Sequence, residues 1–143
     1  MIIRMTAAMN EQIKNHFHTS TPFEGCGLLL GTSSIDDSVD IHSIIPVKNV
    51  AAKPNHHFEL EPEVWVHHLL TSPDLIGLYH THPISASLPS AEDLQDLQSY
   101  GQLMKVYLIA GIDPNEQRLE VKAYEVVKQE HGYSLRHAAL SVT

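Results

Sequence analysis

Two histidines and an aspartate stand at spacings that would let them share one metal ion. His80 and His82 are two residues apart, and residues two apart on an extended strand point to the same face. Pro83 follows at once and favours an extended backbone at His82. With Asp93 as the third ligand, two imidazoles and a carboxylate would leave the fourth position of a tetrahedral zinc site open, as catalytic sites do.

The position of Asp93 depends on a helix that the sequence predicts to begin at Ser90. Ser90 and Asp93 are three residues apart, so at a helix start they share a face. The loop over residues 84–89 is long enough to fold this helix back over the end of the strand. A plainer interpretation is that Ser-x-x-Asp is only a capping box. The two roles compete, because a carboxylate bound to zinc is not free to reach the Ser90 amide.

The chemistry that such a centre allows is hydrolysis. A bound metal ion lowers the pKa of its water to about 7 and polarises a carbonyl. The reaction also needs a proton acceptor, which in zinc peptidases is commonly a carboxylate held near the metal. Glu24 is the candidate, because it opens a predicted buried strand and precedes Gly25, which permits close backbone approach.

The elements that must position these residues alternate between strands and helices. Apolar spacing predicts strands over residues 2–5, 24–31, 41–47, 75–79, 105–110 and 119–126. It predicts helices from the N-cap Thr6 to about His18, from residue 61 to about residue 72, and from Ser90 to about Tyr100. Residues 32–40 are expected to form a polar loop or hairpin tip, and the tail after residue 132 gives no clear pattern. This order indicates a mixed α/β layer fold, a central mixed β-sheet flanked by helices.

Length and composition are those of one folded domain over residues 1–143. The chain is 43% hydrophobic and 18% charged, and its formal net charge is −8. This acidity offers no electrostatic footprint for nucleic acid or for anionic lipid. No apolar stretch approaches the ~20 residues that span a bilayer, and no signal peptide is evident. The single Cys26 fits a reducing compartment. We expect a cytoplasmic protein that binds neither nucleic acid nor membrane.

Three segments together resemble the JAMM (MPN-plus) metalloprotease family. They are the glycine-rich segment 22–31 around Glu24, the His-Thr-His-Pro segment 80–83 and the Ser-Ala-Glu-Asp segment 90–93, and the resemblance extends over about residues 1–127. It implies a layered MPN fold, similar to that of cytidine deaminases. It also implies that His80, His82 and Asp93 bind one zinc ion per chain, that Glu24 is the general base, and that Ser90 donates a hydrogen bond to the tetrahedral intermediate.

The resemblance also implies a substrate class and an alternative. Family members cleave peptide or isopeptide bonds at the C-terminal tail of ubiquitin-like proteins, and small bacterial members act on sulfur-carrier proteins. Hydrolysis of such a tail, by a metal-bound water with help from Glu24, is therefore the predicted function. The alternative is a non-catalytic MPN scaffold for protein–protein assembly, although scaffolds typically lack the ligands. A zinc nucleobase deaminase is excluded, because its signature needs more than one cysteine.

The remaining histidines have no predicted part in the chemistry. His56 and His57 lie in an irregular segment and are expected to be loop residues, or substrate contacts at most. His67 and His68 fall on an amphipathic helix and are expected to be solvated or half-buried. Cys26 lies on a predicted buried strand, where a cysteine is usually an inert small hydrophobic residue.

Overall fold

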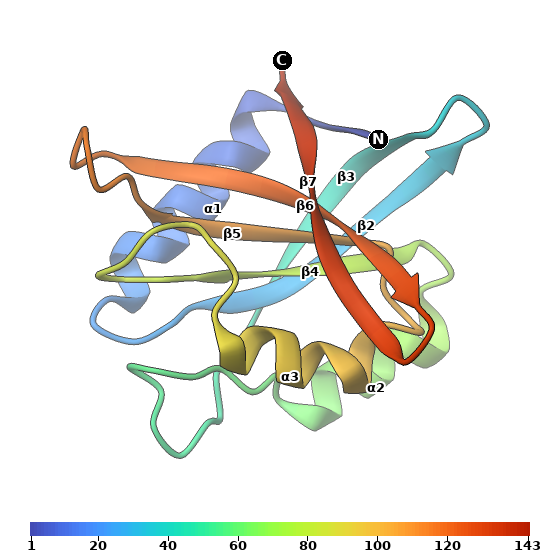
Figure 1. The fold of residues 1–143 in the computed structure, drawn as a ribbon. Helices are drawn as coiled ribbons and strands as arrows, with labels where there is room; N and C mark the ends of the chain where they lie inside the picture. The colour runs from blue at the N-terminus through green and yellow to red at the C-terminus, as the bar shows by residue number, and fades with distance from the viewer.

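Seven strands form one mixed sheet that closes on itself, with three helices packed against it (Figure 1). The computed structural model describes residues 1–143. The spatial order of the strands is β1-β3-β2-β4-β5-β6-β7. Along the chain the elements are β1 (Ile2–Met5), α1 (Ala7–Ser20), β2 (Cys26–Ser34), β3 (Ser38–Val47), α2 (Pro62–Thr71), β4 (Leu75–Thr81), α3 (Ala91–Tyr100), β5 (Val106–Ile112), β6 (Leu119–Gln129) and β7 (Gly132–Val142).

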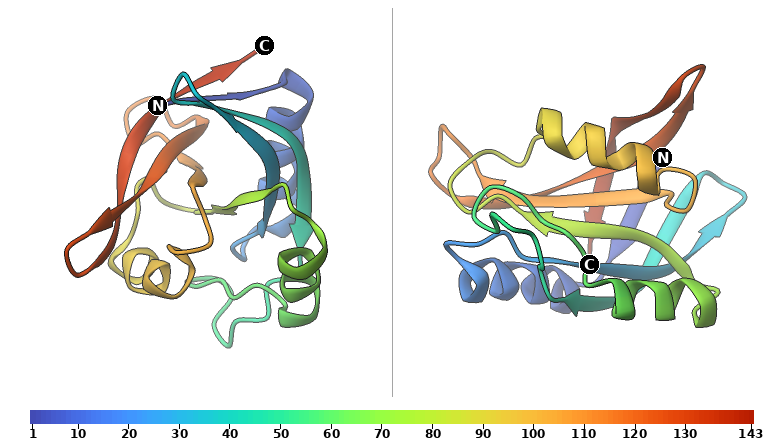
Figure 2. Two further views of the ribbon diagram at one scale, coloured as in Figure 1. Left: turned by 90° about the vertical axis from the view of Figure 1, so that its right-hand side faces the viewer. Right: turned by 90° about the horizontal axis from the view of Figure 1, so that it is seen from below.

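Closure of the sheet depends on the short strand β1. It pairs in parallel with β3 on one side and with β7 on the other, so that Ile2 lies opposite both Ser38 and Ala139. Figure 2 shows the strands curling round until the first and the last meet. Strand β7 occupies the tail in which no clear pattern was found. Ala138 is its only buried residue, so the strand lacks the alternation that marks a half-buried strand.

The segment 32–40 was expected to be a polar loop or hairpin tip; it is a hairpin tip, but its turn is shorter than predicted. Strands β2 and β3 form an antiparallel hairpin that runs through it, with Ser34 opposite Ser38. Only residues 35–37 turn, and Asp37 has a φ of 60° there. The polar side chains of this segment mislead because the last three residues of β2 pair with β3 while their side chains are exposed to solvent.

One face of the sheet packs on α1, and we call it the α1 face. The Thr6 hydroxyl accepts a hydrogen bond from the Met9 amide and caps the helix. Met9, Ile13 and Phe17 recur at helical spacing and are buried. They join a cluster of sixteen buried residues to which all seven strands contribute.

The other face packs on α2, α3 and the segment between β3 and α2, and we call it the α3 face. Its cluster of eleven buried residues includes Leu97 of α3, Phe58 of the connecting segment and Leu78 of β4. Helices α2 and α3 both lie beneath the strands in Figure 1, and Trp65 of α2 meets Tyr100 of α3 edge to face at 5.5 Å between ring centroids.

Strand β4 lies in the middle of the sheet and carries the first predicted ligand. It runs antiparallel to β2 and parallel to β5, so the sheet is mixed, as predicted, and the expected fold class is confirmed. The strand extends to Thr81, two residues beyond its predicted end. No helix of the chain has the length and the apolar character needed to cross a membrane.

Candidate metal centre

The three predicted ligands converge at the end of β4, where α3 begins. His80 Nε2 lies 2.8 Å from His82 Nε2. Asp93 Oδ2 lies 3.3 Å from the first nitrogen and 3.1 Å from the second. Ligand atoms around a tetrahedral ion with bonds of about 2.0–2.1 Å stand about 3.3 Å apart. The spacing of these three atoms is therefore close to that of one shared ion.

Two strands and a helix start hold these side chains. His82 follows β4, yet its amide still donates to the Ala110 carbonyl of β5 at 2.7 Å, so the strand geometry continues through it. Its Nδ1 lies 2.7 Å from the Ala86 carbonyl oxygen and donates to it. That hydrogen bond fixes the tautomer, because it leaves the lone pair on Nε2, which faces His80 and Asp93.

The capping box that was expected to compete for Asp93 is present, and it does not turn the carboxylate away from the histidines. Asp93 Oδ2 accepts a hydrogen bond from the Ser90 amide at 2.9 Å while it also faces both imidazoles. The Ser90 hydroxyl in turn accepts from the Asp93 amide at 3.0 Å, which completes a capping box. A carboxylate oxygen has two lone pairs, so the cap orients Asp93 toward the histidines instead of removing it.

Glu24 lies beside this triangle and its carboxylate has an oxygen with no partner. Glu24 is 7% exposed. Its Oε1 lies 3.9 Å from His80 Nε2 and receives no hydrogen bond from the protein. Glu24, His80 and His82 form a buried group whose ligand atoms lie within 4.8 Å of one another and could hold a metal ion. A buried polar atom without a partner is costly, and a bound cation would relieve that cost.

The backbone of Glu24 is fixed from two sides. Its amide donates to the Pro54 carbonyl at 2.7 Å, and its carbonyl accepts from the Asn49 side chain at 2.9 Å. The next amide, of Gly25, donates to the Thr81 hydroxyl at 2.7 Å. A Cβ at Gly25 would lie 2.7 Å from Ser20 Oγ. Glycine leaves room here for the side chains of Ser20 and His16, which a larger residue would displace.

Burial and mutual contact set the ionisation of the cluster. Burial raises the pKa of Glu24 to about 7 and lowers the pKa of His80. Burial alone would lower the pKa of His82, but its hydrogen bonds with Asp93 and Ala86 raise it. Burial would likewise raise the pKa of Asp93, but the hydrogen bonds with both histidines hold it well below its usual range. Asp93 is thus an anion, and Glu24 of the metal-free protein changes its protonation near neutral pH.

The donor set fits a divalent cation of the zinc type. Two imidazole nitrogens and a carboxylate oxygen are ligands that zinc accepts. The His80 ring lies in an apolar setting, stacked on Phe58 at 4.5 Å and edge to face with Tyr107 at 5.5 Å between ring centroids. Its Nδ1 is buried without a hydrogen-bond partner.

Two cavities meet at Glu24. One of about 400 Å³ extends past His82 and Ser90, and one of about 380 Å³ extends past Phe23 and Asn49. The Ser90 side chain lines the first cavity, and its hydroxyl hydrogen has no acceptor in the protein because the oxygen only accepts from Asp93. The hydroxyl is therefore free to donate to a bound group.

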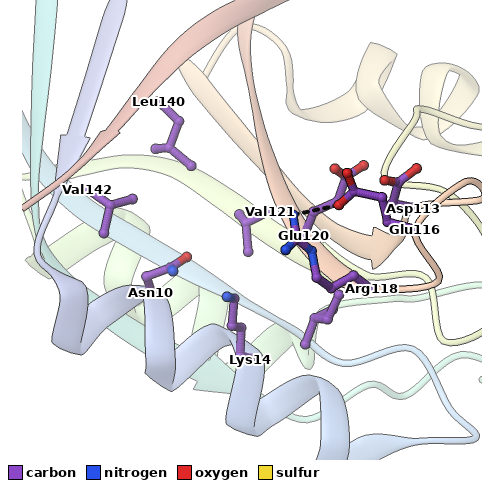
Figure 3. A pocket seen from close by; sticks show the side chains of 10 residues that line it. Asn10, Lys14, Asp113, Glu116, Arg118, Glu120, Val121, Leu140 and Val142 are labelled. Carbon is purple, nitrogen blue, oxygen red and sulfur yellow. Dashed lines mark ion pairs between the residues drawn. The ribbon is translucent and has the colours of Figure 1, made fainter.

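The largest cavity of the molecule, about 430 Å³, lies elsewhere (Figure 3). Lys14 of α1 faces Val121 and Leu140 across it, and Glu116 pairs with Arg118 at its edge. None of the residues that line it belongs to the metal centre, so its size carries no argument for catalysis.

The other histidines and the cysteine lie in the environments that were expected, but His57 makes a contact that was not expected. His56 lines the cavity beside His82, and His67 is exposed. Cys26 is fully buried, and burial raises the pKa of its thiol to about 12. His57 hydrogen-bonds Asp96 one turn beyond Asp93 and ties the segment between β3 and α2 to α3. Sequence reasoning had no signal for this contact.

Comparisons with known proteins identify the family of the chain. Residues 6–125 match the family described as prokaryotic homologs of the JAB domain. The desampylase of Haloferax volcanii is 40% identical over 96 residues, which are 64% of this chain and 65% of that protein. The chain therefore matches somewhat less than two thirds of the length of this curated relative.

Two solved structures share the fold. The solution structure of a protein from Desulfitobacterium hafniense has a TM-score of 0.73 at 24% identity and covers 99% of this chain and 92% of its own. That of a protein from Salinibacter ruber has a TM-score of 0.62 at 22% identity, with coverages of 96% and 90%. The family match alone spans well over half of the sequence, and the chain thus belongs to the prokaryotic homologues of the JAB domain.

Proposed function

We propose that this protein is a zinc-dependent hydrolase of the JAMM type, which cleaves a peptide or isopeptide bond at the tail of a ubiquitin-like or sulfur-carrier protein. The observation that carries the proposal is the convergence of His80 Nε2, His82 Nε2 and Asp93 Oδ2 within 3.3 Å of one another, with a buried carboxylate beside them. Similarity to a desampylase supports a hydrolase that acts on a protein conjugate.

Two carboxylates stand near the histidines, and distance separates their roles. Asp93 Oδ2 lies within ligand-to-ligand spacing of both imidazoles, whereas Glu24 Oε1 is 3.9 Å from His80 Nε2. We therefore assign one zinc ion per chain to His80, His82 and Asp93, and leave Glu24 free. Zinc bound there supplies Lewis-acid polarisation of the scissile carbonyl and acidifies water.

Glu24 is the general base and then the general acid. Its buried carboxylate lies beside the ligands with an oxygen that has no partner, so it can accept a proton there and return it. Glu24 takes the proton of the attacking water and delivers it to the nitrogen of the leaving amine. The free Ser90 hydroxyl donates to the oxygen that becomes negative as the carbonyl carbon turns tetrahedral.

The two cavities that meet at Glu24 suit an extended chain on both sides of the scissile bond. A flexible tail can bind in extended form by adding to a strand edge. Large apolar side chains stand exposed on each side, Phe23 at 50% and Ile84 at 84%. Exposed apolar groups at the rim of a cleft are typical of protein–protein contact, so they would touch the folded part of the substrate.

The test is a panel of ubiquitin-like proteins fused through their tails to a reporter, incubated with the full chain. We expect stoichiometric zinc in the purified protein, cleavage at the fusion junction and loss of cleavage when a chelator removes the zinc. A protein that takes up no zinc even after supplementation would contradict the proposal and favour a non-catalytic scaffold. So would cleavage that persists in the metal-free protein.

A further inference from the structure

Ser87 is a buried polar residue that the proposed chemistry does not use. It lies in the loop between His82 and Ser90, where Ser85 and Leu88 are exposed, and yet its own exposed fraction is 0%. Its hydroxyl donates to Glu120 Oε1 at 2.9 Å. Burial of a hydroxyl in a surface loop needs such a partner. The contact shows that this loop is held down on β6.

A second hydrogen bond holds the same residue by its backbone. The Tyr124 hydroxyl donates to the Ser87 carbonyl at 2.7 Å, and Tyr124 is 4% exposed. The Ile112 amide donates to the Ser85 carbonyl at 2.8 Å, which extends the attachment to β5. Three hydrogen bonds from two strands therefore fix a loop segment that has no regular structure of its own.

Gly111 of β5 allows the loop to approach this closely. A Cβ built on Gly111 would lie 2.5 Å from Ser87 N, 2.7 Å from Ala86 C and 2.7 Å from Ser85 O. All three atoms belong to the loop backbone, which cannot move aside as a side chain can. The segment 85–87 lies flat against the strand because the strand has no side chain there.

The residue inside this fixed segment is Ala86, whose carbonyl accepts from His82 Nδ1 at 2.7 Å. That hydrogen bond sets the ring orientation and the tautomer of a metal ligand. The loop ends at Ser90, which caps α3 and orients Asp93. Any shift of the segment 85–87 would therefore reach two of the three ligand side chains.

We propose that Ser87, Tyr124 and Glu120 position the metal centre by fixing the Ala86 carbonyl against His82. The inference rests on the proposed metal centre. These residues do not touch the metal or the substrate, and they act through the loop. Partners of this kind, which orient a ligand without binding the metal, change metal affinity by about 10- to 100-fold when they are removed.

The experiment measures zinc affinity by chelator competition on the full chain. Tyr124→Phe removes one hydroxyl and should weaken zinc binding about 10-fold or more. Tyr79→Phe is the matched control, because Tyr79 is also a buried tyrosine and its hydroxyl bonds His16, away from the loop. Both variants should lose some thermal stability, and only Tyr124→Phe should lose zinc affinity.

The pair of Ser87 and Glu120 gives an independent arm. Ser87→Ala and Glu120→Ala should each weaken zinc binding, and the double variant should be no weaker than the worse single one, because both changes remove one contact. Glu120→Gln keeps an acceptor oxygen and should restore the affinity. A merely structural role would not produce this pattern of rescue.

His82→Ala separates the failure of this inference from the failure of the metal centre. If His82→Ala abolishes zinc binding while Tyr124→Phe and Ser87→Ala bind zinc as tightly as the wild type, the positioning role is refuted. Equal weakening by Tyr79→Phe would refute it too. If His82→Ala itself keeps wild-type affinity, the metal centre is wrongly assigned and the inference falls with it.

Discussion

The two faces of the sheet differ in the side chains that they bury. The α1 face is filled by sixteen buried apolar side chains, and its one buried tyrosine hydroxyl, on Tyr79, bonds His16. The α3 face begins in the same way, with Leu78 and Leu97. At the end of β4, however, it passes from apolar packing into the cluster of His80, His82 and Asp93.

The side chains of strand β4 point alternately to the α1 face and to the α3 face. Tyr79 belongs to the α1 cluster, and Leu78 and then His80 belong to the α3 face. All the buried polar side chains except Ser38 lie in the metal centre or next to segments that carry it. One face thus secures the fold, while the other tolerates unsatisfied groups such as Glu24 Oε1. Such local cost is common where function needs it.

The largest effect should come from changes that break the polar end of the α3 face. Glu24→Gln should lower kcat by about 100- to 10,000-fold, because a general base contributes that much, and should keep the zinc. Asp93→Asn and His82→Ala should lose both zinc and hydrolysis. Turnover assays with metal analysis of the same samples check this. Wild-type turnover by Glu24→Gln would show that the base is another residue.

Ser90 has both a structural and a chemical role, because it caps a helix and faces the cleft. Ser90→Ala should lower kcat by about 100-fold and destabilise the fold by about 1 kcal/mol. Ser90→Asp keeps a capping oxygen and lacks the hydroxyl donor, so it should recover the stability and not the rate. Steady-state kinetics and chemical denaturation measure the two effects. Recovery of both by Ser90→Asp would assign Ser90 to capping alone.

The cost of the buried carboxylate should appear as a pH dependence of the metal-free protein. Burial raises the pKa of Glu24 from 4.5 to about 7, so the folded state binds this proton more tightly than the unfolded state. Stability is then lost as pH rises from about 4.5 through 7, by at most ~3 kcal/mol. Metal-free Glu24→Gln should be more stable than the wild type at pH 8, and the difference should vanish near pH 4. Denaturation at both pH values tests this, and a constant difference would contradict it.

The smallest effect should come from the α1 face. Ile13 is fully buried there, and Ile13→Val removes one methyl group, which should cost about 1 kcal/mol. Zinc affinity and kcat should not change, because Ile13 packs away from the metal centre. Urea denaturation gives the first quantity, and chelator competition gives the second. A drop in zinc affinity would show that the two faces are coupled.

Most of the elements could be predicted because their signals are local. The N-cap at Thr6 and the spacing of Met9, Ile13 and Phe17 identify α1 from neighbouring residues alone. Strand β7 and the closure by β1 could not be predicted in this way. They depend on pairing between residues far apart in the chain, such as Ile2 and Ala139, and no local pattern reports such pairing.

The same division holds in the metal centre. The spacing of His80 and His82 and the cap at Ser90 place the predicted ligands, and the structure brings those side chains together. Ser87 and Tyr124 had no signal, because their hydrogen bond joins a loop to a strand that lies much later in the sequence. A serine and a tyrosine are common residues, and only the folded chain shows that they meet.

The four residues of β1 also bear on the order in which the molecule can be completed. Since β1 pairs with β7, it leaves the ribosome long before its partner and must wait for β7 before the sheet can close. All three ligands and Glu24 precede β7 in the chain. During synthesis, we therefore expect a stage at which the metal-binding segments have emerged while the sheet is still open. The sheet would then close after all the residues of the metal centre have been synthesised.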